Sequence, residues 1–150
     1  HGWGDIGYSF LIDEQGRIYK GRNSHPAGGD SDTITGQNAA GDGVTGAHAR
    51  SSNAGSVGVA LLGTLTDQDA SPKAKQALED LLAWEAQSHG IDPHGASLYT
   101  SPVDGSQKTF ANIAGHRDVG DTKCPGGAFY TTLPAVRYAV AARMGPSAAR

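Results

Sequence analysis

Apolar and polar residues alternate in part over residues 6–12, and a second short run of mixed character covers residues 17–20. The first run is rich in aromatic and β-branched side chains, and the segment between the two runs, Asp13-Glu14-Gln15-Gly16, has turn chemistry. The pattern predicts a β-hairpin. A nearly continuous run of small and apolar residues at 56–63 is typical of a strand buried on both faces in the middle of a sheet.

Helical periodicity appears twice further along the chain. Apolar residues recur every three or four positions behind Ser71 and Pro72, which favour a helix start, and His89-Gly90 gives a stop. A helix is therefore predicted over residues 71–89. A second amphipathic pattern runs from Leu133 to Met144 and ends at Gly145-Pro146.

The segment between the two helices contains prolines and glycines, and residues 91–108 are predicted to be a loop. Residues 110–114 then form a strand pattern that ends at Gly115-His116. The order strand, helix, strand predicts a right-handed crossover between parallel strands. His116 would then lie beyond the carboxyl ends of the sheet strands, where open α/β sheets bind ligands.

The whole sequence, 150 residues with 37% hydrophobic content, is long enough for one domain with a core. We expect that domain over residues 1–144 and a flexible tail over 145–150. Residues 23–45 are polar, glycine-rich and without a period, which predicts a long surface loop. A net charge of −3 without long Lys or Arg runs argues against nucleic acid, and no apolar run approaches a membrane span, so no membrane insertion is expected.

His116 and the single cysteine, Cys124, lie close together in the sequence and are the strongest candidates for chemistry. Zinc binds imidazole nitrogen and thiolate sulfur, and a catalytic zinc keeps three protein ligands and one open position. The alternative is a loop histidine and a small buried cysteine. Tyr8 is likewise either a core aromatic or a residue that orients a metal-bound water.

The sequence resembles the peptidoglycan recognition proteins and the type-2 N-acetylmuramoyl-L-alanine amidases, including amidase-type bacteriophage lysozymes. Five segments carry this resemblance: residues 2–11, 46–49, 56–59, 115–119 and 124–126. The resemblance runs in the same order over nearly the whole chain. It implies an α/β fold with a mixed, mainly parallel central sheet flanked by helices. It also implies a groove for glycan and stem peptide with a zinc ion at its floor.

The resemblance assigns roles to single positions. It implies that His116 and Cys124 are zinc ligands, that Tyr8 is the catalytic tyrosine and that Thr122 assists catalysis. His48 and Asn53 match positions in or near the groove, either contacting substrate or bracing the loop. The implied reaction is zinc-assisted hydrolysis of the amide between the lactyl group of muramic acid and L-alanine. The alternative is a module that binds peptidoglycan without cleaving it, and a protein that merely keeps the fold ranks third.

Two features depart from the family pattern. The first zinc ligand of the family is a histidine on a strand well upstream of Trp3, and His1 does not align with it. The resemblance therefore implies that the domain over residues 1–144 is N-terminally incomplete and lacks the strand that carries this ligand. The long loop at 23–45 leaves the stem-peptide type open. One cysteine allows no internal disulfide, which fits a bacterial or phage-like enzyme better than an animal one. The resemblance further implies a secreted or cell-wall-associated protein, and we expect a monomer.

Overall fold

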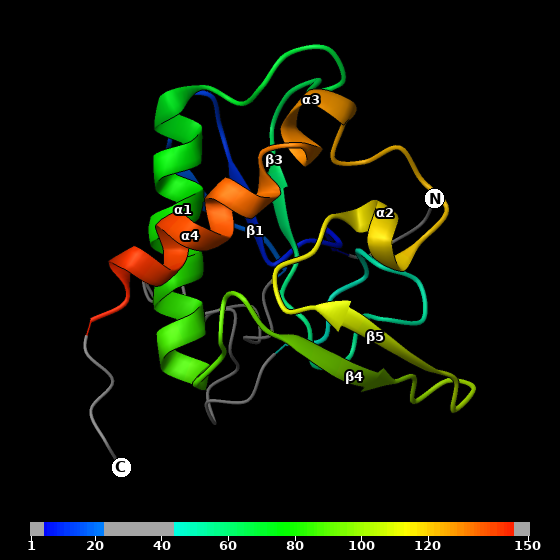
Figure 1. Cartoon of the computed structure of the whole chain (residues 1–150). Helices are drawn as coiled ribbons and strands as arrows, with labels where there is room; N and C mark the ends of the chain where they lie inside the picture. Colours follow the sequence, from blue (N-terminus) through cyan, green and yellow to red (C-terminus); the bar gives the residue numbers. More distant parts are fainter. Residues whose placement is uncertain (1–4, 23–43, 146–150) are drawn as a thin grey trace, which may run out of the picture.

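The computed structural model describes residues 5–22 and 44–145 (Figure 1). A three-stranded sheet contains β1 (Phe10–Ile12), β2 (Ile18–Lys20) and β3 (Val59–Leu61) in the order β2-β1-β3. β1 pairs antiparallel with β2 and parallel with β3, so the sheet is mixed. The predicted hairpin is confirmed, with a first strand shorter than its pattern. The loop predicted at 23–45 and the tail predicted at 145–150 lie almost entirely outside the described residues.

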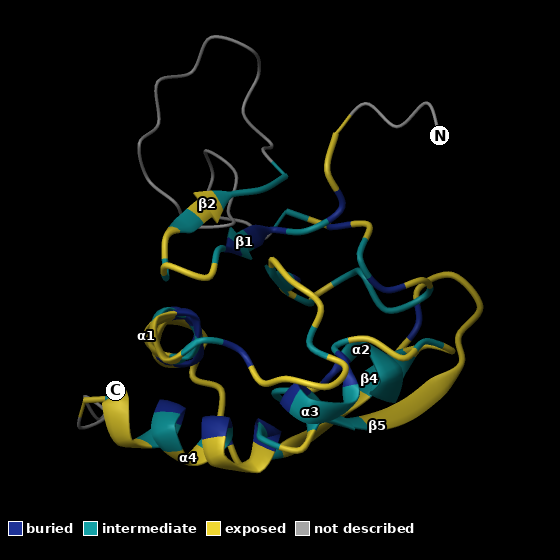
Figure 2. Ribbon diagram, turned by 90° about the horizontal axis from the view of Figure 1, so that it is seen from above, coloured by how far each residue is buried: buried dark blue, intermediate teal, exposed yellow. Residues whose placement is uncertain are grey.

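The long helix α1 (Pro72–His89) begins and ends where the sequence predicts. The Ser71 hydroxyl accepts a hydrogen bond from the Ala74 backbone N–H at 3.0 Å, and Gly90 ends the helix in the left-handed conformation. α1 lies between the three-stranded sheet and α4 (Leu133–Arg143), whose buried side faces it (Figure 2). None of the helices in the described ranges is long and apolar enough to cross a bilayer.

The core lies between these layers and is built from side chains of the sheet, α1, α3 and α4. Four side chains are excluded from solvent almost completely: Phe10, Ile12, Val136 and Val140. Arg143, at the end of α4, also bridges to Glu79 and Asp80 of α1. The hydrophobic face of α1 is thus covered on one side by the sheet, while α4 packs on the other.

Two short helices lie between α1 and α4 in the chain. α2 spans His116–Val119 and α3 spans Gly127–Tyr130. The Ala128 N–H donates to the Thr66 carbonyl at 2.9 Å, and the Phe129 N–H donates to the Leu65 carbonyl at 3.4 Å. The segment that follows β3 therefore supports the first turn of α3.

The prediction of a loop over residues 91–108 is wrong. This segment contains β4 (Ala96–Thr100), which pairs antiparallel with β5 (Gln107–Ala111) in a separate two-stranded sheet. Pro102 and Gly105 lie in the turn of this hairpin rather than in a structureless loop. The strands themselves are mostly exposed, so they lack the apolar alternation by which a half-buried strand is found in a sequence.

The predicted crossover is also wrong, because α1 leads from β3 into the second sheet instead of back to the first. Within the described ranges β3 pairs with β1 alone, and its residues are half-buried, so it is not the mid-sheet strand that its composition predicts. The apolar run of β3 therefore predicted neither how far the strand is buried nor which strands lie beside it.

Glu85 is the one acidic side chain that α1 directs into its buried face. It is only 5% exposed, and both of its carboxylate oxygens are buried without a hydrogen-bond partner. His89 lies one turn further along, with its Nε2 3.4 Å from Glu85 Oε2. Burial raises the pKa of the Glu85 carboxyl, and the nearby His89 opposes that rise only in part.

Replacing Glu85 with glutamine is expected to stabilise the protein at pH 7. A carboxyl whose pKa is higher in the folded than in the unfolded protein lowers the free energy of unfolding as the pH rises from the unfolded pKa through the folded one. Glutamine does not ionise, so it removes this loss. The gain should therefore shrink as the pH falls from the raised folded pKa toward the ordinary value of 4.5, and it should vanish below that value, where the carboxyl is neutral in the folded and the unfolded protein. Urea unfolding from pH 3.5 to 7 measures the difference. A constant difference across that range would contradict the assigned pKa shift.

Candidate active site

Four of the residues singled out in the sequence come together at the amino ends of β1 and β3. Tyr8 lies just before β1, and its ring stacks on that of His48 with centroids 5.9 Å apart and an interplanar angle of 27°. Burial is the main cause of the lowered pKa of His48 and of the raised pKa of Tyr8; His116 contributes to the first shift and Cys124 to the second, so both lie near the stacked pair. The prediction of a site beyond the carboxyl ends of the main sheet is wrong, because β5, which leads to His116, belongs to the other sheet.

The His48 ring sits in a cradle formed by two glycines. A Cβ placed on Gly58 would lie 2.4 Å from the ring Cγ, and one on Gly46 would lie 2.3 Å from Nδ1. Both distances are far below van der Waals contact, so neither position has room for a side chain without moving the ring. A glycine inside an apolar run often marks the close approach of another group, and at Gly58 that group is the His48 ring.

Both nitrogens of His48 face protein groups. Nε2 lies 3.2 Å from the Ser56 hydroxyl, and Nδ1 lies 3.4 Å from the Gly7 carbonyl. Ser56 donates its single proton to the Ser52 carbonyl at 2.6 Å, so it can only accept from His48. The Gly7 carbonyl can likewise only accept, so a neutral imidazole, which has one N–H, can donate to only one of these two groups at a time. The two contacts together fix the ring plane beside Tyr8.

Burial sets the protonation of this stacked pair. It lowers the pKa of His48, and His116 and Arg22 lower it further against the opposing effect of the Gly7 carbonyl. Burial also raises the pKa of Tyr8, with a smaller contribution from Cys124. Both shifts favour the uncharged forms. At neutral pH the site therefore presents a phenol that can donate a hydrogen bond beside a neutral imidazole.

Asn53 braces the turn that carries His48. Its Oδ1 accepts hydrogen bonds from the backbone N–H groups of His48 at 2.8 Å and Ala49 at 2.7 Å. For both residues the sequence leaves two roles open, contact with substrate and bracing of the loop. The observed hydrogen bonds are those expected for bracing. Contact of His48 or Asn53 with a substrate stays a prediction.

His116 and Cys124 lie at opposite ends of one short segment. His116 is the first residue of α2, and the Arg117 N–H donates to the Cys124 carbonyl at 2.9 Å. The Thr122 hydroxyl accepts from the Cys124 N–H at 3.2 Å, so Thr122 fixes the cysteine backbone here. Cys124 is exposed; partial desolvation raises the pKa of its thiol, and the Arg117 charge lowers it.

The donor set of this segment suits zinc, because imidazole nitrogen and thiolate sulfur are among its preferred ligands. A catalytic zinc needs three protein ligands. In residues 5–22 and 44–145 no group of three His, Cys, Asp or Glu side chains gathers closely enough to hold a metal. The described residues therefore supply two fitting donors and not a complete set.

Several residues that shape the site carry no role in the sequence prediction. Ser56 contacts the His48 ring. Arg117 and Asp118 lie between the two donors in the chain, and both contact Tyr130 of α3. Ser56 and Arg117 both fall inside motifs that the family resemblance uses. The pattern marks their positions, but it gives no contact from which a role could be derived.

Three comparisons place the chain among known proteins. It matches the model of the N-acetylmuramoyl-L-alanine amidase family over residues 1–127. It is 34% identical to peptidoglycan-recognition protein SC2 of Drosophila melanogaster over 125 residues, which cover 83% of this chain and 50% of that protein. It is 32% identical to the N-acetylmuramoyl-L-alanine amidase of Sus scrofa over 132 residues, which cover 88% of this chain and 17% of that protein.

The fold agrees with these sequence matches. The structure of wild-type Drosophila PGRP-LB superimposes with a TM-score of 0.59 at 31% identity, covering 89% of this chain and 59% of that one. The chain spans half the length or less of the two curated relatives described above. The predicted α/β fold is confirmed, and the chain belongs to the N-acetylmuramoyl-L-alanine amidase family, whose relatives include peptidoglycan-recognition proteins.

Proposed function

We propose that the protein is a zinc-dependent amidase that hydrolyses the bond between N-acetylmuramic acid and L-alanine in peptidoglycan. The observation that carries this proposal is the meeting of Tyr8 and His48 with His116 and Cys124 at one end of the main sheet. Family membership supports the same reaction. Because peptidoglycan is an extracellular polymer, we also propose that the protein is secreted or associated with the cell wall. We propose further that it acts as a monomer.

In this proposal His116 and Cys124 supply two of the zinc ligands, and the third comes from outside the described residues. Bound zinc would polarise the scissile carbonyl and make a water molecule more acidic. The Tyr8 hydroxyl orients the attacking water or donates to the oxyanion as the amide carbon becomes tetrahedral. The His48 ring holds Tyr8 in place, and Thr122 holds the backbone of Cys124.

A second candidate is a module that binds peptidoglycan without cleaving it. The observation that favours it is that the described part of the chain brings together no group of three metal donors. The two functions share the fold and the polymer and differ in metal binding and chemistry. Zinc content and cleavage, measured on one sample, therefore separate them.

The test uses the protein as it is naturally produced, with its mass determined first. Zinc is measured by mass spectrometry, and purified peptidoglycan is assayed for released peptides with a free L-alanine amino group. About one zinc per chain together with peptide release supports the amidase. Polymer that is bound but uncut by a zinc-free protein supports the binding module and excludes the amidase.

Replacing Tyr8 with phenylalanine is expected to lower kcat for amide hydrolysis by about 10²- to 10⁴-fold, the usual contribution of one positioned proton donor. The ring and its stacking on His48 remain, so the unfolding midpoint should change little. Steady-state kinetics and urea unfolding are measured together.

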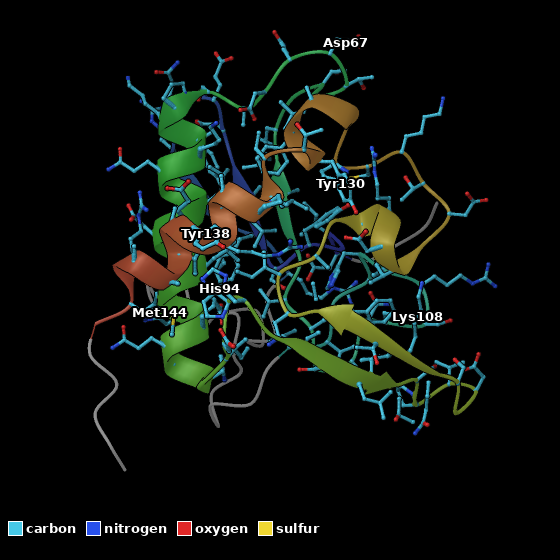
Figure 3. All side chains as sticks on the ribbon, viewed as in Figure 1. Asp67, His94, Lys108, Tyr130, Tyr138 and Met144 are labelled. Atoms are coloured by element: carbon cyan, nitrogen blue, oxygen red, sulfur yellow. The ribbon has the colours of Figure 1, made fainter. Side chains whose placement is uncertain are left out.

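Tyr138→Phe is the matched control, because Tyr138 is 70% exposed on α4, beside His94 (Figure 3). It should leave kcat unchanged. Full activity of Tyr8→Phe would remove Tyr8 from the proposed mechanism.

A further inference from the structure

We propose that Arg117 is a positioning residue that holds His116 and Cys124 in register with each other for metal binding. This inference rests on the proposed zinc site. The guanidinium and the backbone N–H of Arg117 join the two ends of the donor segment, which we define as residues 116–124.

Arg117 makes two hydrogen bonds across the segment. Its backbone N–H donates to the Cys124 carbonyl at 2.9 Å, and its guanidinium Nη2 donates to the Lys123 carbonyl at 2.5 Å. Arg117 follows His116 directly in the chain, and the two carbonyls belong to Cys124 and the residue before it. The bonds therefore close the loop that separates the two metal donors.

The guanidinium is itself held from the other side by an aromatic ring. Its central carbon lies 4.4 Å from the centre of the Tyr130 ring. Tyr130 is the last residue of α3 and lies on its side toward α2 (Figure 3), and its hydroxyl donates to Asp118 Oδ1 at 2.5 Å. Asp118 Oδ2 accepts from the Gly115 N–H at 2.8 Å. These contacts fix the backbone on both sides of His116.

The Arg117 side chain is not arranged for stability alone. Its Nε is buried without a hydrogen-bond partner, and an unpaired buried donor is unfavourable to folding. Residues that break such a rule are concentrated at functional sites. The planar guanidinium can stack on a ring and donate in its own plane at the same time, which a lysine ammonium cannot do. Contacts that orient metal ligands from behind typically change metal affinity by about 10- to 100-fold.

The test compares Arg117→Gln and Arg117→Lys with the parent protein. Zinc affinity is measured by competition with a chromophoric chelator, and hydrogen exchange is measured at the residue 117 amide. Both variants are expected to bind zinc about 10- to 100-fold more weakly and to exchange that amide faster. Arg143→Gln is the matched control, because it removes bonds to Glu79, Asp80 and Ala139 far from the site. It should leave zinc affinity unchanged.

Parent-like zinc affinity in both Arg117 variants would overturn the inference, and so would an equal loss in Arg143→Gln. Retention of affinity in Arg117→Lys alone would show that charge suffices and would overturn the positioning role. If the parent itself binds no zinc, the proposed function fails instead. Should the Arg117 variants not fold, Tyr130→Leu and Tyr130→Phe decide. Both remove the bond to Asp118, but only the leucine variant also removes the ring on which the guanidinium stacks, so its loss of zinc affinity should be the larger one. Equal affinities in the two variants would overturn the inference.

Discussion

Replacing Cys124 with serine is expected to reduce amide hydrolysis to the background of the assay and to remove bound zinc. A serine hydroxyl is not ionised at neutral pH, whereas zinc takes the cysteine as a thiolate. Cys124 is exposed, and its backbone bonds to Thr122 and Arg117 do not involve sulfur. The free energy of unfolding of the metal-free protein should therefore change by no more than about 0.5 kcal/mol. Zinc content, peptide release and urea unfolding measure the three effects.

His116→Gln serves as the partner variant for this experiment. If the two donors act as one site, the single variants and the double variant should lose activity to the same extent, because groups that act as a unit are not additive. Activity that survives in Cys124→Ser and disappears in His116→Gln would separate the two residues. It would remove the cysteine from the proposed site.

Replacing Gly126 with alanine is expected to lower the free energy of unfolding by about 2–6 kcal/mol, combining backbone strain and overpacking of about 1–3 kcal/mol each. Gly126 has φ of +100° and ψ of 148°, a region that residues with a Cβ rarely adopt. A Cβ there would lie 2.2 Å from the Leu65 carbonyl oxygen. A loss of this size is a large part of the usual total stability of about 5–15 kcal/mol. Urea unfolding of the metal-free protein measures it.

Gly55→Ala is the matched control for backbone conformation. Gly55 also has a positive φ, +68°, but a Cβ there would meet no atom within 4 Å. It should cost only about 1–2 kcal/mol, the penalty for the left-handed region alone. Equal losses in the two variants would show that contact with Leu65 contributes nothing.

Local sequence signals predicted the hairpin and both long helices, because each has its own start, stop and period within a few residues. Ser71 and Gly90 mark the ends of α1, and the helix follows them. The β4–β5 hairpin could not be found in this way, since its strands are exposed and lack an apolar face. The partners of β3 also could not be found, because pairing depends on residues far away in the chain.

The candidate site was predicted through family resemblance rather than through geometry. His116 and Cys124 alone would have left a loop histidine and a free thiol as good alternatives. The structure adds which groups surround them: the Ser56 bond to His48, the two glycines under the ring, and the Arg117 contact with Tyr130. Except for Gly46, which is two residues from His48, these groups are 8 to 13 positions apart in the sequence, so no local pattern contains the contacts.

β3 serves both halves of the candidate site. Gly58, immediately before the strand, lies under the His48 ring, and the carbonyls of Leu65 and Thr66, a few residues beyond it, hold the first turn of α3. A slip of β3 by one residue against β1 would move a side chain under the ring and withdraw both carbonyls from α3 at the same time. Loss of strand register would therefore disable the whole site in one step, without a state in which only one half is intact.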